Sequence, residues 1–291
     1  MRFDLHVHTT ASDGTLTPSA LVRRAAERGL AAVAITDHDS VEGIPEALRA
    51  VASLTEHPIA VIPGVELSAV HRSRDIHLLG YFVHHTDPSL SAHLEDLRSA
   101  RRHRAETIVA ALTAAGYAIT LDEVLELSAG GAVGRSHVAR ALVDRGHAED
   151  VTDAFSRLLG RGKPFYVAKD VRTPLEVLRI VREAGGVPVL AHPGITRADD
   201  LIPELIDAGL AGIEAFHAEH TPEQRERYQA LARRHGLIAT GGTDYHGPLA
   251  PNPPLGSTDV PVEALTSLFE AAGRPLPPHI VDALPADGPA T

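Results

Sequence analysis

The stretch FDLHVH, residues 3–8, places two histidines one residue apart within an apolar run, and Asp13 follows shortly after. In a β-strand, residues two apart project from the same face, so His6 and His8 would lie side by side. An isolated pair of this kind is more often found on a solvated strand face. The meaning of the pair therefore depends on what the rest of the chain supplies.

Composition and charge limit the possible classes of protein. The 291 residues suffice for one large domain or for a barrel with an insertion, and the lack of cysteine excludes disulfides, thiolate metal sites and a thiol nucleophile. No apolar run could span a bilayer and no signal peptide is evident, so we expect a cytoplasmic protein without a membrane partner. The net charge of −11 disfavours binding of duplex DNA through phosphate neutralisation alone.

Short apolar runs alternate with helical patterns along the chain. Amphipathic segments at 18–29, 174–186 and 222–236 each begin with a proline that follows a threonine, which sets an N-cap hydroxyl before a proline at the first helical position. Strands that alternate with helices indicate parallel pairing, and the absence of a glycine-rich dinucleotide fingerprint favours a barrel over an open sheet. The predicted strands are 3–8, 31–37, 59–67, 75–83, 187–193, 211–217 and 237–244.

A helical stretch interrupts this alternation between the fourth and fifth strands. Residues 90–161 contain several helical patterns and no clear strand, so we predict a helical insertion that can fold over the substrate site. The barrel domain then comprises residues 1–89 and 162–275. The tail, residues 276–291, is rich in proline and small residues and is expected to be extended or disordered.

Side chains able to bind metals or exchange protons recur at the ends of the predicted strands. In a parallel barrel, the carboxyl ends of all strands meet at one face. So many imidazoles and carboxylates in one place would be costly to bury unless cations were bound among them. The residues are His6, His8, Asp37, His38, Asp39, Glu66, His77, His192, Glu214, His217, Asp244 and His246.

Six motifs, in this order, resemble those of the PHP (polymerase and histidinol phosphatase) superfamily of metal-dependent phosphoesterases. They are DLHVHTTASDG (4–14), ITDHD (35–39), GVE (64–66), IHLLGY (76–81), AHP (191–193) and GTDYHG (242–247). The resemblance implies an α/β fold, a distorted (β/α)7 TIM-like barrel, with a trinuclear metal site at its carboxyl-terminal face. It also implies hydrolysis of a phosphate ester by a hydroxide that bridges two metals, without a covalent intermediate.

The resemblance further implies three sets of metal ligands. The first is His6, His8, Glu66 and Asp244; the second shares Glu66 and adds His77 and His192; the third is Asp13, His38 and His246. Imidazole and carboxylate ligands suit Mn²⁺, Fe²⁺ or Zn²⁺ and do not choose between them. Asp37 is expected either to orient His38 or a neighbouring ligand, or to cap a helix.

Two motifs in the insertion, GRSHVARAL (134–142) and LGRGKPFYV (159–167), resemble a nucleotide-directed subgroup of the family. That subgroup includes nucleotide phosphatases, 3′,5′-nucleotide bisphosphatases and 5′-3′ exoribonucleases. The resemblance implies a small phosphorylated substrate: AMP, a 3′,5′-bisphosphonucleotide or the 5′ end of a short RNA. It assigns substrate contacts to Arg135, His137, Lys163 and His217. The basic run RSARRHRAE (98–106) is instead predicted to be a solvated helix face, with binding of an oligonucleotide backbone as the alternative.

Other functions remain open at this point. A histidinol-phosphate-type phosphatase would use the same metals with a different pocket in the insertion. A non-catalytic, metal-stabilised binding module would be expected to have lost ligands, whereas all nine positions here hold competent ones. Amidohydrolases also gather histidines at a barrel mouth, but the order of the motifs fits the phosphoesterases better.

Overall fold

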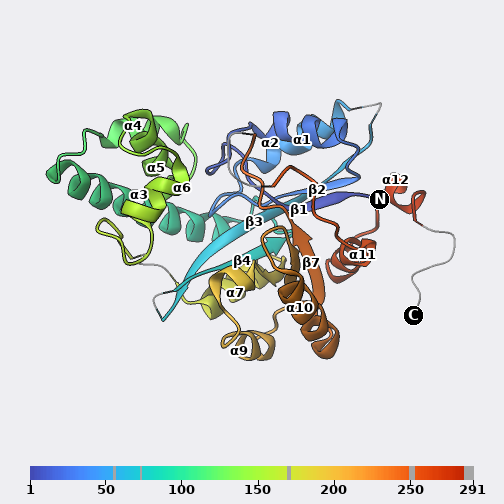
Figure 1. The fold of residues 1–291 in the computed structure, drawn as a ribbon. Coiled ribbons are helices and arrows are strands. Elements are labelled where there is room, and N and C mark those ends of the chain that lie inside the picture. The colour runs from blue at the N-terminus through green and yellow to red at the C-terminus, as the bar shows by residue number, and fades with distance from the viewer. Residues whose placement is uncertain (55–56, 73, 169–171, 249–252, 285–291) are drawn as a thin grey trace.

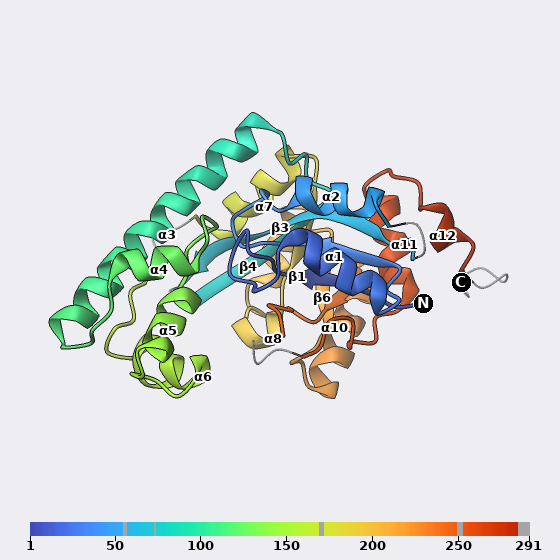
Figure 2. The same ribbon diagram turned by 90° about the horizontal axis from the view of Figure 1, so that it is seen from above.

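Seven strands follow one another around a sheet that almost closes into a barrel (Figures 1 and 2). The computed structural model describes residues 1–54, 57–72, 74–168, 172–248 and 253–284. The last strand leads back to the first, where the His8 N–H donates to the Tyr245 carbonyl over 2.8 Å. The strands are β1 (Phe3–Val7), β2 (Ala32–Ile35), β3 (Ala60–His71), β4 (Arg74–Tyr81), β5 (Val187–Leu190), β6 (Gly212–His217) and β7 (Ile238–Gly242). The expected distorted seven-stranded barrel is confirmed.

One strand runs against the others. β4 pairs antiparallel with both β3 and β5, while the remaining described neighbours in the sheet pair in parallel. The prediction of uniformly parallel pairing is therefore wrong at β4, because β3 and β4 form a hairpin instead of being joined by a helix. The chain reverses next to Arg72, whose φ of 48° lies in the left-handed region. His77 consequently lies in the first half of β4 and faces the mouth from there, opposite Ser68 of β3.

Helices cover the outside of the barrel, and their starts agree with the predicted Thr-Pro signals. The hydroxyls of Thr17, Thr173 and Thr221 each accept a hydrogen bond from the backbone N–H three residues later, which satisfies one unpaired donor of the first turn. The helices outside the insertion are α1 (Pro18–Glu27), α2 (Ile44–Ala52), α7 (Pro174–Glu183), α8 (Pro193–Thr196), α9 (Ile202–Asp207), α10 (Pro222–His235), α11 (Val262–Ala271) and α12 (Pro278–Val281).

Alternation along the strands divides the core into two clusters. Residues such as Ala34 and Ile62 pack together with α11, as expected of a barrel interior filled by side chains. The intervening residues, such as Ile35 and Val65, pack against the covering helices. Glu66 projects from the same face of β3 as Ile62, because side chains two or four positions apart share a face. The barrel therefore aims Glu66 at its own mouth.

The segment between β4 and β5 forms a separate helical unit, drawn in green in Figures 1 and 2. Residues 88–168, all of which the structure describes, contain no strand. The unit has its own hydrophobic cluster, which includes Ile108, Leu142 and Leu159. Its elements are α3 (Pro88–Ala114), α4 (Leu121–Leu127), α5 (Arg135–Asp144), α6 (Val151–Ala154) and a turn of π-helix, η1 (Phe155–Leu159).

The tail and the surface complete the fold. Part of the tail, predicted to be extended or disordered, forms the short helix α12, because Ile280 is fully buried against the barrel. Residues 285–291 lie outside the described part of the chain.

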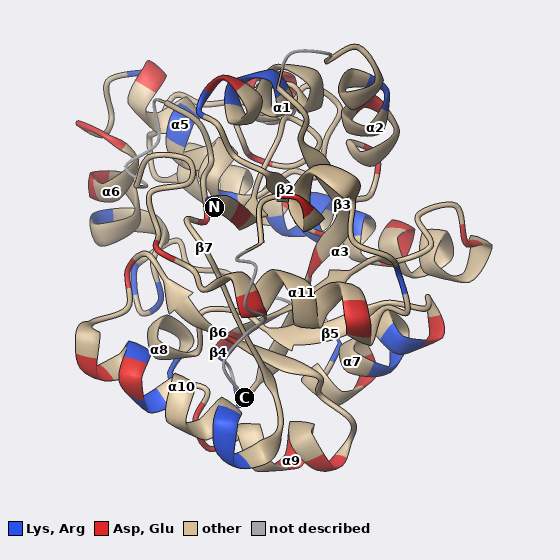
Figure 3. Ribbon diagram, turned by 90° about the vertical axis from the view of Figure 1, so that its right-hand side faces the viewer, with Lys and Arg blue, Asp and Glu red and all other residues tan. Residues whose placement is uncertain are grey.

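Acidic and basic residues are interspersed over the outer helices (Figure 3). Within the described residues, no helix combines the length and apolarity needed to cross a membrane.

Candidate metal centre

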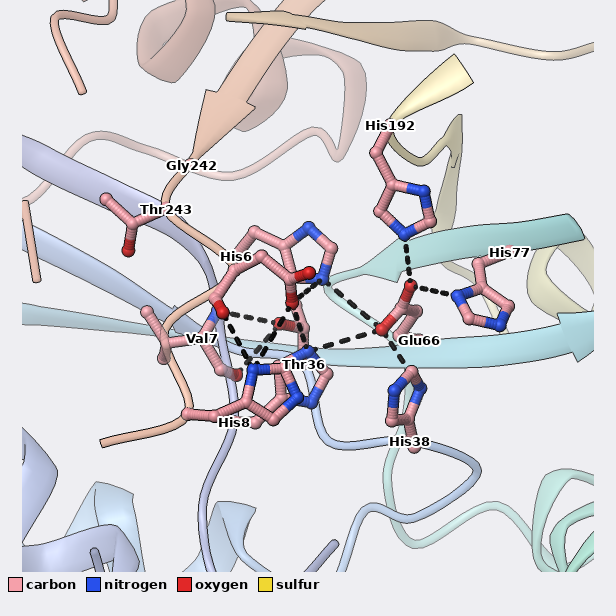
Figure 4. A network of polar contacts seen from close by, with 12 residues as sticks. His6, Val7, His8, Thr36, His38, Glu66, His77, His192, Gly242 and Thr243 are labelled. Carbon is pink, nitrogen blue, oxygen red and sulfur yellow. Dashed lines mark hydrogen bonds and ion pairs between the residues drawn. The ribbon is translucent and has the colours of Figure 1, made fainter. Parts of the chain in front are cut away.

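A single buried carboxylate lies at the centre of the histidines from the strand ends (Figure 4). Glu66 is fully buried, and each of its oxygens faces a different group of imidazoles. Oε2 lies 3.3 Å from His6 Nε2, 3.2 Å from His8 Nε2 and 3.0 Å from His38 Nδ1. Oε1 lies 2.7 Å from His77 Nδ1 and 3.0 Å from His192 Nε2. A carboxylate in this position can bridge two cations.

Two aspartates extend this cluster. Asp244 Oδ1 lies 3.0 Å from His8 Nε2, and Asp13 Oδ1 lies 3.3 Å from His246 Nε2. The rings of His8 and His246 stack with their centroids 4.1 Å apart. The structure thus brings all nine predicted ligands together. Four groupings of described residues have ligand atoms within reach of one ion: His6, His8, Glu66 and Asp244; His8, Asp13, His38 and His246; His38, Glu66 and His77; and His6, Glu214 and His217. His192 is in none of the four and joins the cluster through Glu66 Oε1.

The groups are suited to divalent cations. Several inward-facing atoms are buried yet form no hydrogen bond within the described chain, which is costly unless something else satisfies them. Imidazole nitrogens together with carboxylate oxygens are ligands that Mn²⁺, Fe²⁺ and Zn²⁺ accept. The atoms include His6 Nε2, His8 Nε2, His38 Nδ1, Glu66 Oε2, Asp13 Oδ1 and Asp244 Oδ1.

Charges within the cluster depend strongly on one another. Burial alone would lower the pKa of His8, but the carboxylates of Asp244 and Glu66 outweigh it and raise that pKa to about 10. Burial would likewise raise the pKa of Glu66, but the surrounding imidazoles, His38 foremost, hold it well below its usual value. Without cations, protons on His6, His8 and His246, whose pKa values the carboxylates raise against the effect of burial, therefore offset the carboxylate charge, whereas burial lowers the pKa of His38. A bound cation would take the place of those protons.

Glu214 holds His6 from behind. Its Oε1 lies 3.1 Å from His6 Nδ1, and its Oε2 accepts the backbone N–H of His192 over 2.8 Å. A carboxylate on the outer ring nitrogen fixes the tautomer that leaves Nε2 facing the cluster. Sequence reasoning placed Glu214 at a strand end without assigning it this role.

Asp37 braces the loop that leads to Asp13. It accepts hydrogen bonds of 2.7 Å from the Thr9 N–H, the Thr9 hydroxyl and the Ser12 hydroxyl. It does not cap α2, whose N-cap is Gly43. Of the expectations for Asp37, the helix cap is wrong. Support of the loop before Asp13 agrees with the expectation that Asp37 orients a ligand neighbouring His38.

The backbone is strained at three places around the centre. Asp39, His192 and Asp244 have φ values of 49°, 28° and 53°, in the left-handed region that non-glycine residues rarely adopt. Each such residue costs on the order of 1–3 kcal/mol and persists only where its surroundings enforce it. Strain of this kind gathers at functional sites.

A small pocket of about 130 Å³ opens beside the cluster, towards the helical unit. Asp13, His38 and His77 line one side of it, and three arginines with Ser136 line the other. Arg135 donates to Asp75 over 2.8 Å, and its guanidinium lies 5.5 Å from the ring centroids of Phe155 and Tyr166. The pocket therefore combines a cluster able to bind cations with an anion-binding wall.

Two of the three arginines come from α3 and were missed by sequence reasoning. Arg101 donates to Asp39 over 2.5 Å and to Ser68 over 2.9 Å. Arg104 donates to the Val167 carbonyl over 2.8 Å, while its Nη2 is buried without a hydrogen bond among the described residues. Burial and the neighbouring Arg135 lower the pKa of Arg104 to about 10, so it stays charged at neutral pH.

The prediction of a solvated face for residues 98–106 is therefore only partly right. The side chains of Arg102 and His103 are 60% and 85% exposed, whereas Arg101 and Arg104 lie inward. The signal was their spacing of three residues, which places both on one helix face.

The helical unit is attached to the barrel at residues next to the centre. The Ser136 hydroxyl donates to Asp13 over 2.8 Å, and the Ala132 N–H donates to the Ala11 carbonyl over 3.1 Å. Gly131 packs so closely that a Cβ atom there would lie 2.6 Å from the Thr10 carbonyl oxygen. These contacts and the arginine pairs hold α3 and α5 over the mouth.

The remaining predicted substrate contacts differ in their surroundings. His137 is buried, and its Nδ1 accepts the Gly134 N–H over 3.0 Å, so it caps α5. Lys163 is exposed and is not among the residues that line the pocket. His217 is buried, accepts the Glu219 N–H over 3.2 Å on Nδ1, and places Nε2 3.9 Å from Asp244 Oδ2.

Comparison with known proteins agrees with this geometry. A family model described as "PHP domain" matches residues 4–163, more than half of the chain. The 5′-3′ exoribonuclease Rnm of Escherichia coli is 38% identical, covering 84% of this chain and 85% of that protein. The 3′,5′-nucleoside bisphosphate phosphatase of Chromobacterium violaceum is 36% identical, covering 84% and 87%.

A solved structure shares the fold. A metal-dependent phosphoesterase from Bifidobacterium adolescentis superposes with a TM-score of 0.86 at 34% identity, covering 92% of this chain and 96% of that one. The barrel and its cluster define a metal-dependent hydrolase of phosphoric esters. The chain belongs to the PHP family.

Proposed function

We propose that the chain hydrolyses phosphate esters of nucleotides, namely AMP or 3′,5′-bisphosphonucleotides and, beyond these, the 5′ ends of short RNAs. In this proposal three divalent ions, Mn²⁺, Fe²⁺ or Zn²⁺, are held by His6, His8, Asp13, His38, Glu66, His77, His192, Asp244 and His246. The observation that carries it is the pocket in which a buried imidazole–carboxylate cluster faces three arginines. Relatives named as acting on nucleotides or RNA support the choice of substrate.

The cations would supply an activated water and offset charge on the phosphoryl oxygens. The chain's own residues orient the ligands: Glu214 fixes His6, and Asp37 fixes the loop before Asp13. No protein nucleophile is required. The chain has no cysteine. The Ser136 hydroxyl, which lies in the pocket, donates its hydrogen bond to Asp13.

The arginines would bind the phosphate. A guanidinium matches phosphate oxygens with two parallel N–H donors, and Arg104 keeps one buried nitrogen without a partner in the described chain. The pocket, at about 130 Å³, is smaller than the roughly 300–1,000 Å³ typical of whole-ligand sites. We therefore place a phosphoryl group inside it and the nucleoside outside. Arg135 remains a proposed phosphate contact, with His137 and His217 as supports; exposed Lys163 would reach only the outer part of a substrate.

Phosphate release by the Mn²⁺-reconstituted protein tests this function. The substrates are AMP, a 3′,5′-bisphosphonucleotide, histidinol phosphate and a 5′-phosphorylated short RNA, with His8→Ala as the control. We expect turnover of the nucleotides that disappears in His8→Ala. Preference for histidinol phosphate would favour the alternative phosphatase.

The route of hydrolysis has its own test. In a single turnover in H₂¹⁸O, label should appear in the released phosphate. A trapped phosphoenzyme would contradict the proposal. Absence of turnover on all four substrates, with metal shown to be bound, would indicate either a different phosphate ester as the substrate or a non-catalytic binding module.

A further inference from the structure

The loop after β5 carries His192 in a backbone conformation that is unfavourable by itself. His192 has φ 28° and ψ 55°, and α8 begins at the next residue. Its imidazole must nevertheless face the centre, with Nε2 3.0 Å from Glu66 Oε1. Glu214 accepts the His192 N–H, which fixes one point of the loop. The His192 carbonyl also accepts the Ile195 and Thr196 N–H groups, over 3.0 and 3.3 Å, but these two bonds lie within the loop and do not attach the turn to the neighbouring strand.

A second attachment holds Gly194, two residues later. The Gly194 N–H donates to His220 Nε2 over 3.1 Å, and the Gly194 carbonyl accepts from Gln224 Nε2 over 3.2 Å. Both polar groups of one peptide residue are thus bound by side chains 26 and 30 positions further along the chain. The fit is close, because a Cβ atom at Gly194 would lie 2.8 Å from Gln224 and 2.9 Å from His220.

His220 is arranged to support the loop and not to bind a cation. Its Nδ1 faces the Ala215 carbonyl at 3.1 Å, which requires the proton on Nδ1 and leaves Nε2 as the acceptor for Gly194. Both ring nitrogens are therefore used, although the ring centroid lies only 5.3 Å from that of His217. The ring is buried, and burial lowers its pKa, which keeps this neutral tautomer.

We propose that His220 and Gln224 are positioning residues that hold Gly194 and thereby set the direction of His192. The proposal rests on the proposed role of His192 as a metal ligand. Ala215 neighbours Glu214 on β6, so the same strand fixes the loop both at the His192 N–H and, through His220, at Gly194. Release of Gly194 would let the strained His192 relax away from Glu66.

Mn²⁺ binding tests this positioning role without relying on activity. His220→Asn keeps a donor near the position of Nδ1, for Ala215, but loses the acceptor for Gly194. His220→Gln does the opposite, since its amide oxygen can take the place of Nε2. Gln224→Glu removes the donor to the Gly194 carbonyl while keeping an acceptor for the Thr221 N–H, which Gln224 also binds. His235→Asn, at the exposed end of α10, is the matched control.

The number of Mn²⁺ ions per chain and the dissociation constant of the weakest ion are measured by competition with a chelator. We expect His220→Asn and Gln224→Glu to weaken that ion by about 10–100-fold, the usual effect of losing a partner behind a metal ligand. His220→Gln and His235→Asn should bind like the unchanged protein. If His220→Asn does not fold, as judged by circular dichroism, the outcome for Gln224→Glu decides.

His192→Ala separates the two proposals. Loss of an ion in His192→Ala, with unchanged binding in folded His220→Asn and Gln224→Glu, would overturn the positioning role alone. Unchanged Mn²⁺ binding in His192→Ala would instead overturn the ligand role of His192, and the positioning role with it.

Discussion

The two oxygens of Glu66 face five imidazoles. We therefore expect metal binding to depend on the negative charge of this side chain as well as on its shape. Glu66→Gln keeps the volume but removes the negative charge that offsets cations and protonated histidines alike. We expect a loss of Mn²⁺ affinity and of kcat of more than about 100-fold, beyond the 10–100-fold typical of outer partners. Metal content and kcat on the preferred nucleotide check this, and near-normal values would contradict a bridging role.

Glu214 offers a milder test of the same centre. Glu214→Gln keeps one oxygen, which at the position of Oε2 lies 2.8 Å from the His192 nitrogen and 3.3 Å from His6 Nδ1, but it loses the charge and replaces Oε1, 3.1 Å from His6 Nδ1, by an NH2 donor. We expect Mn²⁺ affinity to fall by about 10–100-fold while the ion count at saturating metal is unchanged. A chelator titration measures the shift. An affinity equal to that of the unchanged protein would show that the carboxylate does not tune His6.

The raised pKa of His8 predicts the pH dependence of metal binding. With a pKa of about 10, His8 carries a proton at neutral pH in the metal-free protein, and a cation must displace it. Binding should therefore release protons and strengthen as pH rises towards 10. Calorimetry in buffers of different ionisation enthalpy measures the release. Heats that do not depend on the buffer would contradict the prediction.

The same shift affects the stability of the metal-free protein. A histidine whose folded pKa exceeds its ordinary value of 6.5 stabilises the fold fully below that value. This stabilisation is lost as pH rises through about 10. The apo protein should thus lose stability between these limits. The metal-loaded protein, in which a cation has replaced the proton, should not show this loss.

Among the elements, β4 shows best what the sequence could and could not predict. Its apolar alternation identified a strand, and His77 was placed in the cluster through the family motif. Its direction was not predictable, because the reversal at His71–Arg74 lacks the Asn-Gly or Asp-Gly pair that marks a tight hairpin. Long-range pairing with β5 decides the direction instead.

The helix α3 shows a second limit. Charged residues occur along much of its length, so periodicity alone does not single out an inner face. Arg101 points inward and binds Asp39, and Arg104 points inward and binds the Val167 carbonyl. Both partners lie far away in sequence. The proposed metal ligands were therefore predictable, because they lie in family motifs. The inward position of Arg101 and Arg104 was not, because it depends on how α3 packs on the barrel.

Arg104 tests the role proposed for the inner face of α3. Arg104→Met keeps much of the apolar stem and removes the charge beside the pocket. Because a hydrogen bond to a charged group contributes about 1.5–3 kcal/mol, we expect KM for the nucleotide to rise by roughly 10–100-fold. Mn²⁺ binding should not change. Arg102→Met, on the exposed face of the same helix, is the control. An equal effect of both variants would contradict the pocket role.

At the scale of the whole molecule, the centre joins the carboxyl ends of most parallel strands to the first half of β4. Cations that bind only the folded chain stabilise it by about 2.7 kcal/mol at a concentration of 100 times Kd. For a chain of this size, we expect Mn²⁺ to raise Tm by an amount on the order of 5 °C, and EDTA to reverse the change. Thermal scans of the unchanged protein and of His8→Ala measure this. An equal rise in both would mean that the ions bind elsewhere.

The attachment of the helical unit limits how this architecture can acquire new substrates. Ser136, Arg101 and Arg135 bind Asp13, Asp39 and Asp75, which lie in or beside the metal centre. Grafting a foreign unit onto the barrel would therefore disturb the cation ligands along with the substrate wall. Evolution and engineering alike are expected to change specificity by single substitutions on the inner faces of α3 and α5. Wholesale exchange of the unit should cost the hydrolytic activity itself.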